Sequence, residues 1–395
     1  MKTNYCAIKD LKLYISDGNY SEKYPRSDEF VSSGIPFLRA NNISHDTIID
    51  QDLYYITDEK HQELLKGHVR TGDILLTTRG NIGQAAIVPS RHNNSNINAQ
   101  IVLLRVDGEE VDNHYLLYAL QSEDAKRQYD TLQTGTALKQ LPIGRLMQVK
   151  VNMPEIAEQR WIANVIKKCN KLIFLRKQQL KKLDEFVKAR FVEMFGSNGN
   201  QVPLMDYVWF QEGPGVRTVD FTETGTILLT GSNINDNKIT FGHKSDRHIS
   251  NELAMGKYAH FMCDKDDVLV VSSAIDPIKF DKKVVVVDED KKYCLNTGII
   301  RFKPNKRYLT LGYFREFLKT DYFKNQVSSE MHGIAQMHFG PSHLKQMTIL
   351  LPDSINLQIE FEEFVQQIYK SKLSVQKSLD KLEILKKVLM QKYFG

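Results

Sequence analysis

The sequence predicts an α+β chain with two similar mixed α/β domains, separated by two long helices that form an antiparallel coiled coil. Three observations lead to this fold class. The second half of the chain repeats the first, short β-rich runs alternate with turn residues in each half, and each half closes with a long helix. The length of 395 residues fits two or three domains at roughly 100–200 residues each.

The internal duplication is visible as collinear identities between the two halves. The shift between matched positions is 198 residues, and it becomes 199 after one inserted residue near Pro352. Matched pairs are Tyr115 and Tyr313, Gln128 and Gln326, Gln159 and Gln358, and Phe195-Gly196 with the closing Phe394-Gly395. A duplicated chain is expected to have an internal pseudo-twofold relation.

Each half has a mixed α/β part followed by a helical part. We place the mixed domains at 1–154 and 197–352, and the long helices at 155–196 and 353–395. Strands are expected at 74–78, 86–88, 101–106, 268–271 and 284–287, where β-branched runs lie between Gly, Asn, Asp and Pro. One short helix is expected in each half, at 115–129 and 313–327.

The two long helices carry an apolar stripe in alternating steps of four and three residues. In the first helix, the stripe is Ile162, Ile166, Cys169, Ile173, Arg176, Leu180, Leu183, Val187, Arg190 and Met194. In the second, it is Phe361, Val365, Ile368, Lys372, Val375, Leu379, Leu382, Lys386, Leu389 and Tyr393. Such a stripe is typical of a coiled coil, and the equal lengths make each helix the simplest partner of the other.

Composition excludes several classes of protein. With 42% apolar and 26% charged residues, the chain is neither disordered nor a small disulfide scaffold. It has no run of about 18 apolar residues that would span a membrane, and its first residues lack the apolar core of a signal peptide. The four cysteines lie far apart, which disfavours structural zinc and fits a cytoplasmic location.

The expected symmetry of the chain suits DNA, whereas the net charge alone does not indicate it. The net charge is only +5, and residues 155–196, with 10 basic and 5 acidic residues, hold an excess of the same size. An antiparallel helix pair of roughly 50 Å would relate the two halves by a pseudo-twofold axis. Duplex DNA has its own dyads and a helical turn of about 34–36 Å, so it is a suitable ligand.

The chain resembles the specificity subunit of type I restriction–modification systems. The resemblance spans essentially the whole chain and lies in the order of its parts, which occur twice. Its pieces are GDILLTTRGNIGQAAIV at 72–88, NINAQIVLLR at 96–105, TGTALKQL at 134–141, VKVNMPEIAEQRWIANVI at 149–166 and FVEMFG at 191–196. The second copy departs locally, because it lacks the GNIG turn and has HGIAQMHF in place of TGTALKQL.

The resemblance implies a non-catalytic subunit. Each mixed domain would be a target recognition domain that reads one half of a bipartite site in double-stranded DNA, and the coiled coil would set the unread spacer. Two methyltransferase subunits carrying S-adenosylmethionine would dock on the helices and methylate adenine. Two restriction subunits could join them, bringing ATP and magnesium. The chain itself would bind no cofactor and no metal, and no membrane partner is expected.

Candidate DNA-binding residues are amide, guanidinium and hydroxyl side chains in loops, because these groups make hydrogen bonds to base edges. Arg79 could donate to guanine, and Asn81 or Gln84 could bind adenine. In the first domain the candidates are Arg39, Asn41, Asn42, Thr78, Arg79, Asn81, Gln84, Thr136 and Lys139. In the second they are Thr230, Ser232, Asn233, Ser272, Ser273, Lys279, Gln336 and His338.

Two other functions remain open on the sequence alone. One is a self-contained magnesium-dependent nuclease that would use Asp276, Glu289 and Lys291, a pattern that a charged hairpin turn also produces. The other is a coiled-coil adaptor that binds protein. There is no phosphate-binding Gly-x-x-x-x-Gly-Lys-[Ser/Thr] loop and no Asn/Asp-Pro-Pro-Tyr/Phe tetrapeptide of amino-methyltransferases, so ATP hydrolysis and methyl transfer are not expected in this chain.

Overall fold

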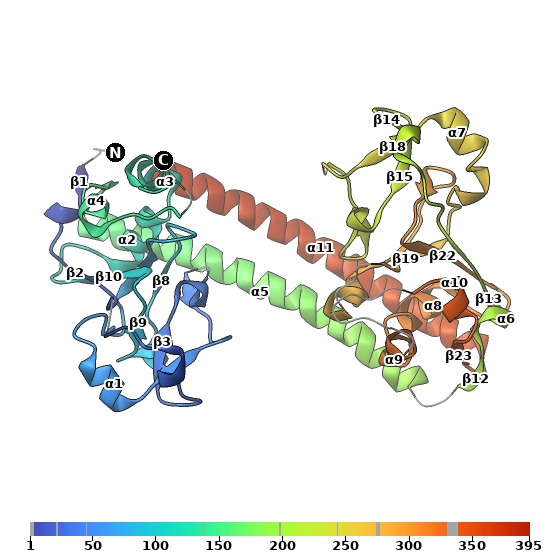
Figure 1. Cartoon of the computed structure of the whole chain (residues 1–395), viewed down its shortest axis with the longest axis horizontal. Helices are drawn as coiled ribbons and strands as arrows, with labels where there is room; N and C mark the ends of the chain where they lie inside the picture. Colours follow the sequence, from blue (N-terminus) through green and yellow to red (C-terminus); the bar gives the residue numbers. More distant parts are fainter. Residues whose placement is uncertain are drawn as a thin grey trace. The chain divides into compact units, whose positions relative to one another are not determined.

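The computed structural model describes residues 4–20, 23–44, 46–136, 138–196, 199–242, 244–273, 277–329 and 339–395. The chain forms two compact units (Figure 1). Unit 1 comprises Met1–Lys177 and Lys377–Gly395, and unit 2 comprises Gln178–Gln376. The last residues of the chain therefore belong to the same unit as its first residues.

Unit 1 is built around a four-stranded antiparallel sheet in the order β2-β10-β7-β8. Smaller sheets are β1-β11, β6-β3-β9 and β4-β5. Its strands are β1 (Tyr5–Ala7), β2 (Leu13–Asp17), β3 (Ile35–Leu38), β4 (Ile43–Ser44), β5 (Thr47–Ile48), β6 (Tyr54–Ile56), β7 (Ile74–Thr77), β8 (Ala85–Ile87), β9 (Asn96–Ile97), β10 (Ile101–Val106) and β11 (Lys150–Asn152).

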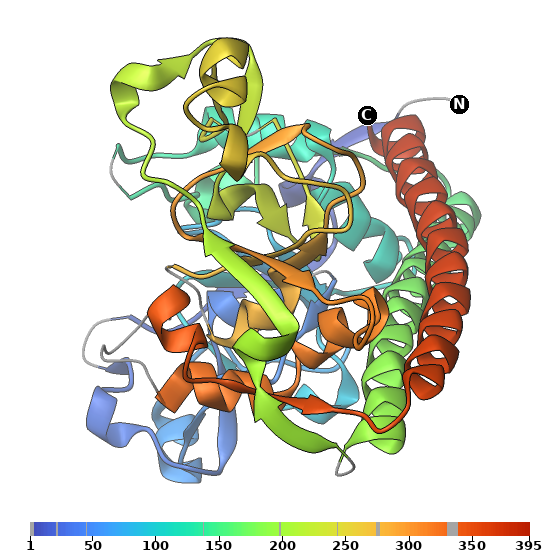
Figure 2. The same ribbon diagram turned by 90° about the vertical axis from the view of Figure 1, so that its right-hand side faces the viewer.

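Unit 2, which faces the viewer in Figure 2, repeats this topology with one additional strand, β14. Its sheet β13-β22-β19-β20 corresponds to the four-stranded sheet of unit 1, and β12-β23, β14-β18-β15-β21 and β16-β17 correspond to the smaller ones. Its strands are β12 (Asn200–Pro203), β13 (Val208–Glu212), β14 (Phe221–Thr222), β15 (Thr226–Leu229), β16 (Ile234–Asn235), β17 (Lys238–Ile239), β18 (Arg247–Ile249), β19 (Val268–Val271), β20 (Val284–Val286), β21 (Tyr293–Leu295), β22 (Ile299–Pro304) and β23 (Thr348–Leu351).

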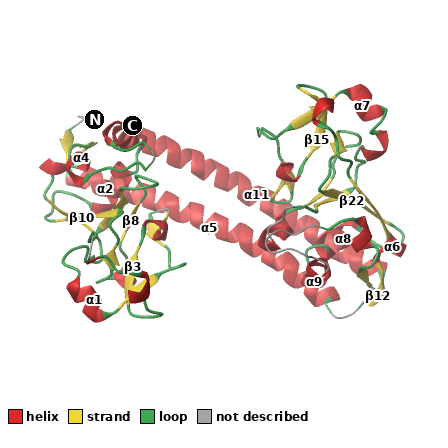
Figure 3. Ribbon diagram, viewed as in Figure 1, coloured by secondary structure: helices red, strands yellow, loops and turns green. Residues whose placement is uncertain are grey.

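Short helices accompany these sheets in both units (Figure 3). Unit 1 has α1 (Asp58–Glu63), α2 (Asn113–Leu120), α3 (Glu123–Leu132) and α4 (Ile143–Leu146). Unit 2 has α6 (Leu204–Tyr207), α7 (Asn251–Met255), α8 (Leu311–Phe317), α9 (Asp321–Ser329) and α10 (Pro341–Leu344). The expected duplication is therefore present in the helices as well as the strands.

The single helix predicted at 115–129, and its counterpart at 313–327, was wrong. Each segment is two helices, because a hydroxyl side chain interrupts it and caps the second helix. Ser122 Oγ accepts from the backbone N–H of Ala125 at 3.1 Å, and Thr320 Oγ1 accepts from that of Phe323 at 3.3 Å. An N-cap of this kind satisfies a backbone donor that the helix itself leaves free.

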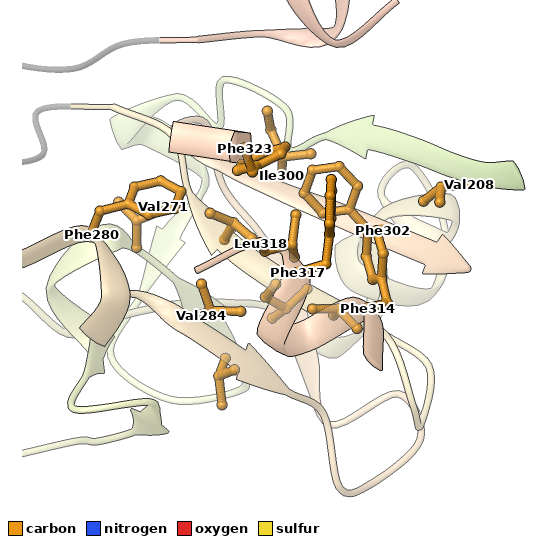
Figure 4. Packing of buried hydrophobic residues seen from close by; sticks show 14 of the residues in the cluster. Val208, Val271, Phe280, Val284, Ile300, Phe302, Phe314, Phe317, Leu318 and Phe323 are labelled. Carbon is orange, nitrogen blue, oxygen red and sulfur yellow. The ribbon is translucent and has the colours of Figure 1, made fainter. Parts of the chain in front are cut away.

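The core of unit 2 lies between its four-stranded sheet and helices α8 and α9, and it is rich in aromatic rings (Figure 4). The rings of Phe302 on β22 and Phe314 on α8 meet at 5.6 Å in an edge-to-face arrangement. Phe317 and Phe323 meet in the same way at 5.8 Å. Burial of such rings, about 1.5–3 kcal/mol for each side chain, holds the short helices on the sheet.

Helices α5 (Ile156–Phe195) and α11 (Ile355–Phe394) pair antiparallel within each unit. In unit 1 the rings of Trp161 and Tyr393 lie 5.9 Å apart, and Cys169 contacts the backbone of Leu382. In unit 2 Arg190 pairs with Glu360 at 3.1 Å. All residues of both predicted stripes are buried or half-buried, which confirms the coiled-coil pattern. Across the described residues, every helix is too short or too polar to cross a membrane.

The matched residues of the sequence repeat hold equivalent places in the two units. Gln159 accepts from the N–H of Asp112 at 2.9 Å, and Gln358 accepts from that of Thr310 at the same distance. The Tyr115 hydroxyl donates to a carbonyl of β11 at 2.8 Å, and Tyr313 donates to the equivalent carbonyl of β23. The identities between the halves therefore mark residues that tie helices to strands.

Candidate nucleic-acid interface

The first candidate loop of unit 1 follows β3 and consists of a short 3-10 turn, Ala40–Asn42. Asn42 is fully buried, and its amide bonds the backbone of Arg39, Ile49 and Gln51 at 3.0–3.3 Å. Asn41 points outward and is exposed. The two neighbouring asparagines therefore differ, because one holds the loop together and the other presents its amide to solvent.

Arg39 packs along the same loop. Its guanidinium lies 3.5 Å from the centroid of the Tyr54 ring and donates to the backbone carbonyl of Asp52 at 2.8 Å. A guanidinium over an aromatic face keeps its charge while its orientation is fixed.

The second candidate loop connects β7 to β8 and spans residues 78–84. The Thr77 hydroxyl donates to the Asn81 carbonyl at 2.5 Å and accepts from the Gln84 N–H at 3.0 Å, which fixes the turn. Thr78 is buried, and both its N–H and its hydroxyl donate to the carbonyl of Gln100. Gly80 has a φ of +73° and lies at an open position, where glycine avoids the strain of a side chain.

Arg79 projects from this loop towards Tyr20, with its guanidinium 5.2 Å from the ring centroid. Partial burial and a hydrogen bond to Asp17 raise the pKa of Tyr20 to about 12. The tyrosine is therefore neutral at physiological pH. This support for Arg79 was not predicted from the sequence, since Tyr20 is distant in the chain.

The third candidate loop, residues 134–140, packs beside the second. The Leu141 N–H donates to the Thr78 carbonyl at 2.8 Å, and the Gly80 N–H donates to the Lys139 carbonyl at 3.4 Å. Thr136 and Lys139 are exposed on it. The structure thus brings together candidates that lie about 60 residues apart in the sequence.

The first and second loops of unit 1 line a half-open hollow of about 570 Å³. Its polar walls include Asn41, Asn81 and Gln84, and its apolar walls include Ala40 and Ile43. We call this the unit 1 hollow. Three of the predicted site residues therefore line one concave surface.

Unit 2 has the same first loop with different side chains. Asn233 is fully buried and accepts from the N–H of Thr230 at 2.9 Å, as Asn42 does in unit 1. Thr230 and Ser232 hydroxyls lie 2.7 Å apart, and Ser232 also bonds the hydroxyl of Ser245 at 3.0 Å. Only Ser232 of the three is exposed.

The remaining candidates of unit 2 lie in and beyond the segment between β19 and β20. Ser272 is buried, Ser273 is half-buried, and Lys279 is exposed on the 3-10 helix Pro277–Lys282. The next residue, Phe280, anchors this helix in the core (Figure 4). Gln336 and His338 lie outside the described residues, so the structure does not place them.

Two contacts to helix α5 were not predicted from the sequence. In unit 1, Asp46, at the β4–β5 turn, accepts from the amide of Asn170 at 2.6 Å. In unit 2, Asp281 in the 3-10 helix before β20 pairs with Lys188. Neither contact could be predicted from the sequence, because Asn170 and Lys188 resemble the other polar residues on the exposed face of a helix.

Two of the residues proposed for a nuclease, Glu289 and Lys291, pair with other side chains. Glu289 pairs with Lys292 at 2.7 Å, and Lys291 pairs with Asp264 at 2.5 Å. Asp276 lies outside the described residues. Within the described part of the chain, no group of three or more His, Cys, Asp or Glu side chains could hold a metal ion. The nuclease alternative is not supported.

Comparison with known proteins supports a relationship to one family. A family model described as "Type I restriction modification DNA specificity domain" matches residues 15–185. Two curated relatives from Methanocaldococcus jannaschii cover 41% and 42% of this chain. They are a putative type I restriction enzyme MjaX specificity subunit, 26% identical, and the type I restriction enzyme MjaVIII specificity subunit, 22% identical. The matched region is 39% and 40% of their lengths, so the chain spans less than half of either relative.

Solved structures extend the likeness of fold to the whole chain. The type I restriction–modification S subunit from M. genitalium has a TM-score of 0.56 at 14% identity, over 100% of this chain and 97% of that one. A structure from work on complex assembly and conformational transition of the type I R-M system has a TM-score of 0.59 at 14% identity, over 99% and 97%. At this identity the likeness concerns the fold alone.

Two copies of one mixed α/β fold, each with polar loops and each followed by a long helix, define a duplicated α/β protein. Residues 15–185 of this chain are similar to the DNA specificity domain of type I restriction–modification systems.

Proposed function

We propose that this chain is the non-catalytic DNA-sequence-specificity subunit of a type I restriction–modification complex. Each unit reads one half of a bipartite site in double-stranded DNA, and the paired helices set the spacer between the halves. The observation that carries the proposal is the duplicated fold, in which equivalent loops present different side chains. Equivalent loops with different donors and acceptors are what a protein needs to read two different half-sites.

The candidate residues divide into two roles in this proposal. The exposed or half-buried side chains Asn41, Arg79, Asn81, Gln84 and Lys139 in unit 1 are suited to contact DNA. The buried set is suited instead to shape the loops that carry them. The side chains of Asn42, Thr78 and Asn233 bond backbone carbonyls, and Ser272 bonds a carbonyl through its backbone N–H. The buried candidates are Asn42, Thr78, Asn233 and Ser272.

The long helices are suited to dock two adenine-methyltransferase subunits. Beside the buried stripe they carry a second set of apolar side chains that are about half exposed or more. These are Trp161, Phe174, Ile384 and Val388 in unit 1, and Phe186, Val192, Ile359 and Leu373 in unit 2. Exposed apolar side chains in this number are typical of surfaces that bind another protein.

The chemistry in this proposal belongs to the partner subunits. The methyltransferase subunits would carry S-adenosylmethionine, and restriction subunits, where they assemble, would bring ATP and magnesium. The specificity chain would bind DNA and position the partners on it.

The test is long-read methylome sequencing of the source cell with and without this gene. We expect loss of one bipartite adenine-methylation motif, two short halves around a fixed gap, and its return when the gene is restored. An unchanged methylome in cells that express the methyltransferase would contradict the proposal. The adaptor alternative fails if exchange of residues 1–154 for another recognition domain changes only one half of the motif.

A further inference from the structure

The unit 1 hollow carries three side-chain amides that have no hydrogen-bond partner among the residues that the structure describes. Asn41 and Asn81 are exposed and Gln84 is half-buried. Within the described part of the chain, none of these amides bonds another group, whereas the neighbouring amide of Asn42 makes three hydrogen bonds. Unpaired amides gathered on one concave wall are available to a ligand.

The same place in unit 2 is closed by a side chain of the protein itself. Gln84 and Lys283 are equivalent, because each directly precedes an edge strand of its four-stranded sheet, β8 in unit 1 and β20 in unit 2. Each also accepts from the backbone N–H at the end of the neighbouring strand: Thr77 to Gln84 at 2.8 Å, and Val271 to Lys283 at 3.2 Å. The two positions therefore have the same backbone setting and different side chains.

Lys283 fills the space that is open in unit 1. Its ammonium donates to the carbonyls of Gly231 and Ile234 at 3.2 and 2.7 Å, and to the Asn235 side chain at 2.8 Å. Counted along the matched turn, these residues correspond to Ala40, Ile43 and Ser44, which line the unit 1 hollow. The Lys283 ammonium thus donates hydrogen bonds to this turn in unit 2, whereas the equivalent turn in unit 1 faces the open hollow.

The walls of the hollow select a neutral polar ligand. Its described lining residues are all uncharged, so among them neither a phosphate nor a cation would find an opposite charge. A side-chain amide offers one donor and one acceptor side by side. Adenine presents the complementary pair in the major groove, an amino group at N6 and an acceptor at N7.

We propose that the unit 1 hollow reads the adenine of an A·T base pair in one half-site, with Gln84 as the specificity-determining residue and Asn41 and Asn81 beside it. This inference rests on the proposed function and goes further, because it names a base and the residue that reads it. Unit 2 reads its half-site without this feature, since Lys283 occupies the equivalent place.

The experiment compares alleles of this gene in the source cell by methylome sequencing. Gln84→Ala removes the amide. Gln84→Lys introduces the side chain that closes the equivalent place in unit 2, so the fold is expected to accept it. The matched controls are Gln148→Ala and Gln148→Lys, at an exposed glutamine of unit 1 that is not part of the hollow. Thermal unfolding of the purified chains checks that each variant folds.

We expect both Gln84 variants to relax one position in one half of the motif, where A·T falls from nearly all methylated sites to its background frequency. The other half and the gap stay unchanged, and the Gln148 variants keep the wild-type motif. If Gln84→Ala abolishes methylation, the readout becomes DNA binding. The variant complex is then tested on a series of duplexes in which one base pair at a time is substituted. Equal binding to A·T and G·C at one position then supports the inference.

Three results overturn it. They are an unchanged motif in both Gln84 variants, a change confined to a G·C pair, or undiminished discrimination at every position of the duplex series. A wild-type chain that directs no bipartite methylation would overturn the proposed function itself, whereas an intact wild-type motif with any of the three results overturns only this inference.

Discussion

At the scale of single residues, the repeat identities mark structural positions. Gln159 is buried, and besides the Asp112 N–H it bonds the carbonyls of Glu110 and Pro154 at 3.1 and 2.8 Å. Gln358 has the same role in unit 2, where it bonds the Thr310 N–H and the Tyr308 carbonyl, both at 2.9 Å. A buried backbone group without a partner is costly, so one amide side chain here joins the start of α2 or α8 to the long helix.

We expect Gln159→Ala to lower the free energy of unfolding of unit 1 by about 1–3 kcal/mol, because it leaves buried backbone groups without partners. Urea denaturation of the purified chain measures this change. Gln148→Ala, at an exposed glutamine of the same unit, is the control and should stay within about 0.5 kcal/mol of wild type. An equal effect of both substitutions would contradict the role given to Gln159.

At the scale of elements, the far end of each long helix completes the core of a unit. Phe394 at the end of α11 lies 4.9 Å from the ring of Tyr115 in unit 1, and Phe195 at the end of α5 lies 4.8 Å from Tyr313 in unit 2. The matched closing dipeptides of the sequence therefore mark core residues. The core of each unit therefore contains residues from the start of one long helix and from the end of the other.

Phe394→Ala should destabilise unit 1 by about 3–5 kcal/mol, the usual cost of truncating a buried phenylalanine. Protease sensitivity and calorimetry of the full chain would detect the change, with peptides of unit 1 released first. Val388→Ala, at a side chain 54% exposed on the same helix, is the matched control. Release of unit 2 peptides first would disagree with this packing.

A second element-scale prediction concerns the β4–β5 turn. The Asp46–Asn170 hydrogen bond ties this turn to α5, so Asn170→Ala should speed amide hydrogen exchange at residues 43–48. Asn164→Ala, at an exposed asparagine of the same helix, should leave that exchange at the wild-type rate. Faster exchange in both variants would mean that the helix as a whole, and not this contact, controls the turn.

At the scale of the whole molecule, the charge distribution governs DNA binding. Residues 1–154 hold 17 basic and 19 acidic residues, and residues 197–352 hold 19 and 18. Several lysines in the units are also paired with carboxylates, among them Lys60 with Glu29 at 2.7 Å and Lys291 with Asp264. These ion pairs reduce the number of cations that can contact phosphate, and phosphate contacts supply most of the salt-dependent affinity for DNA.

The isolated chain should therefore bind duplex DNA weakly, with a Kd of about 1–100 µM at physiological salt. Fluorescence anisotropy with a labelled duplex, repeated at two salt concentrations, would measure both affinity and salt dependence. Addition of the methyltransferase subunits should tighten binding. Tight, salt-resistant binding by the chain alone would show that the units themselves supply enough phosphate contacts.

The duplication, the two long helices and the positions of the main strands could be predicted from the amino-acid sequence alone. These follow from local or periodic patterns: apolar steps of four and three, β-branched runs between turn residues, and identities at a constant shift. The sequence also identified the loops that carry the polar candidates, since Gly, Asn and Thr cluster there.

Which of those candidates face outward depends on the packing of the folded chain. Asn41 and Asn42 are adjacent and chemically identical, yet one is exposed and the other buried, because the turn after β3 directs one amide inward to its own backbone. Three features bring together residues from about 40 to more than 120 positions apart in the sequence. They are the unit 1 hollow, the Lys283 hydrogen bonds at the equivalent place in unit 2, and the Asp46–Asn170 hydrogen bond. Such joins depend on how sheets and helices pack, and no local pattern records them.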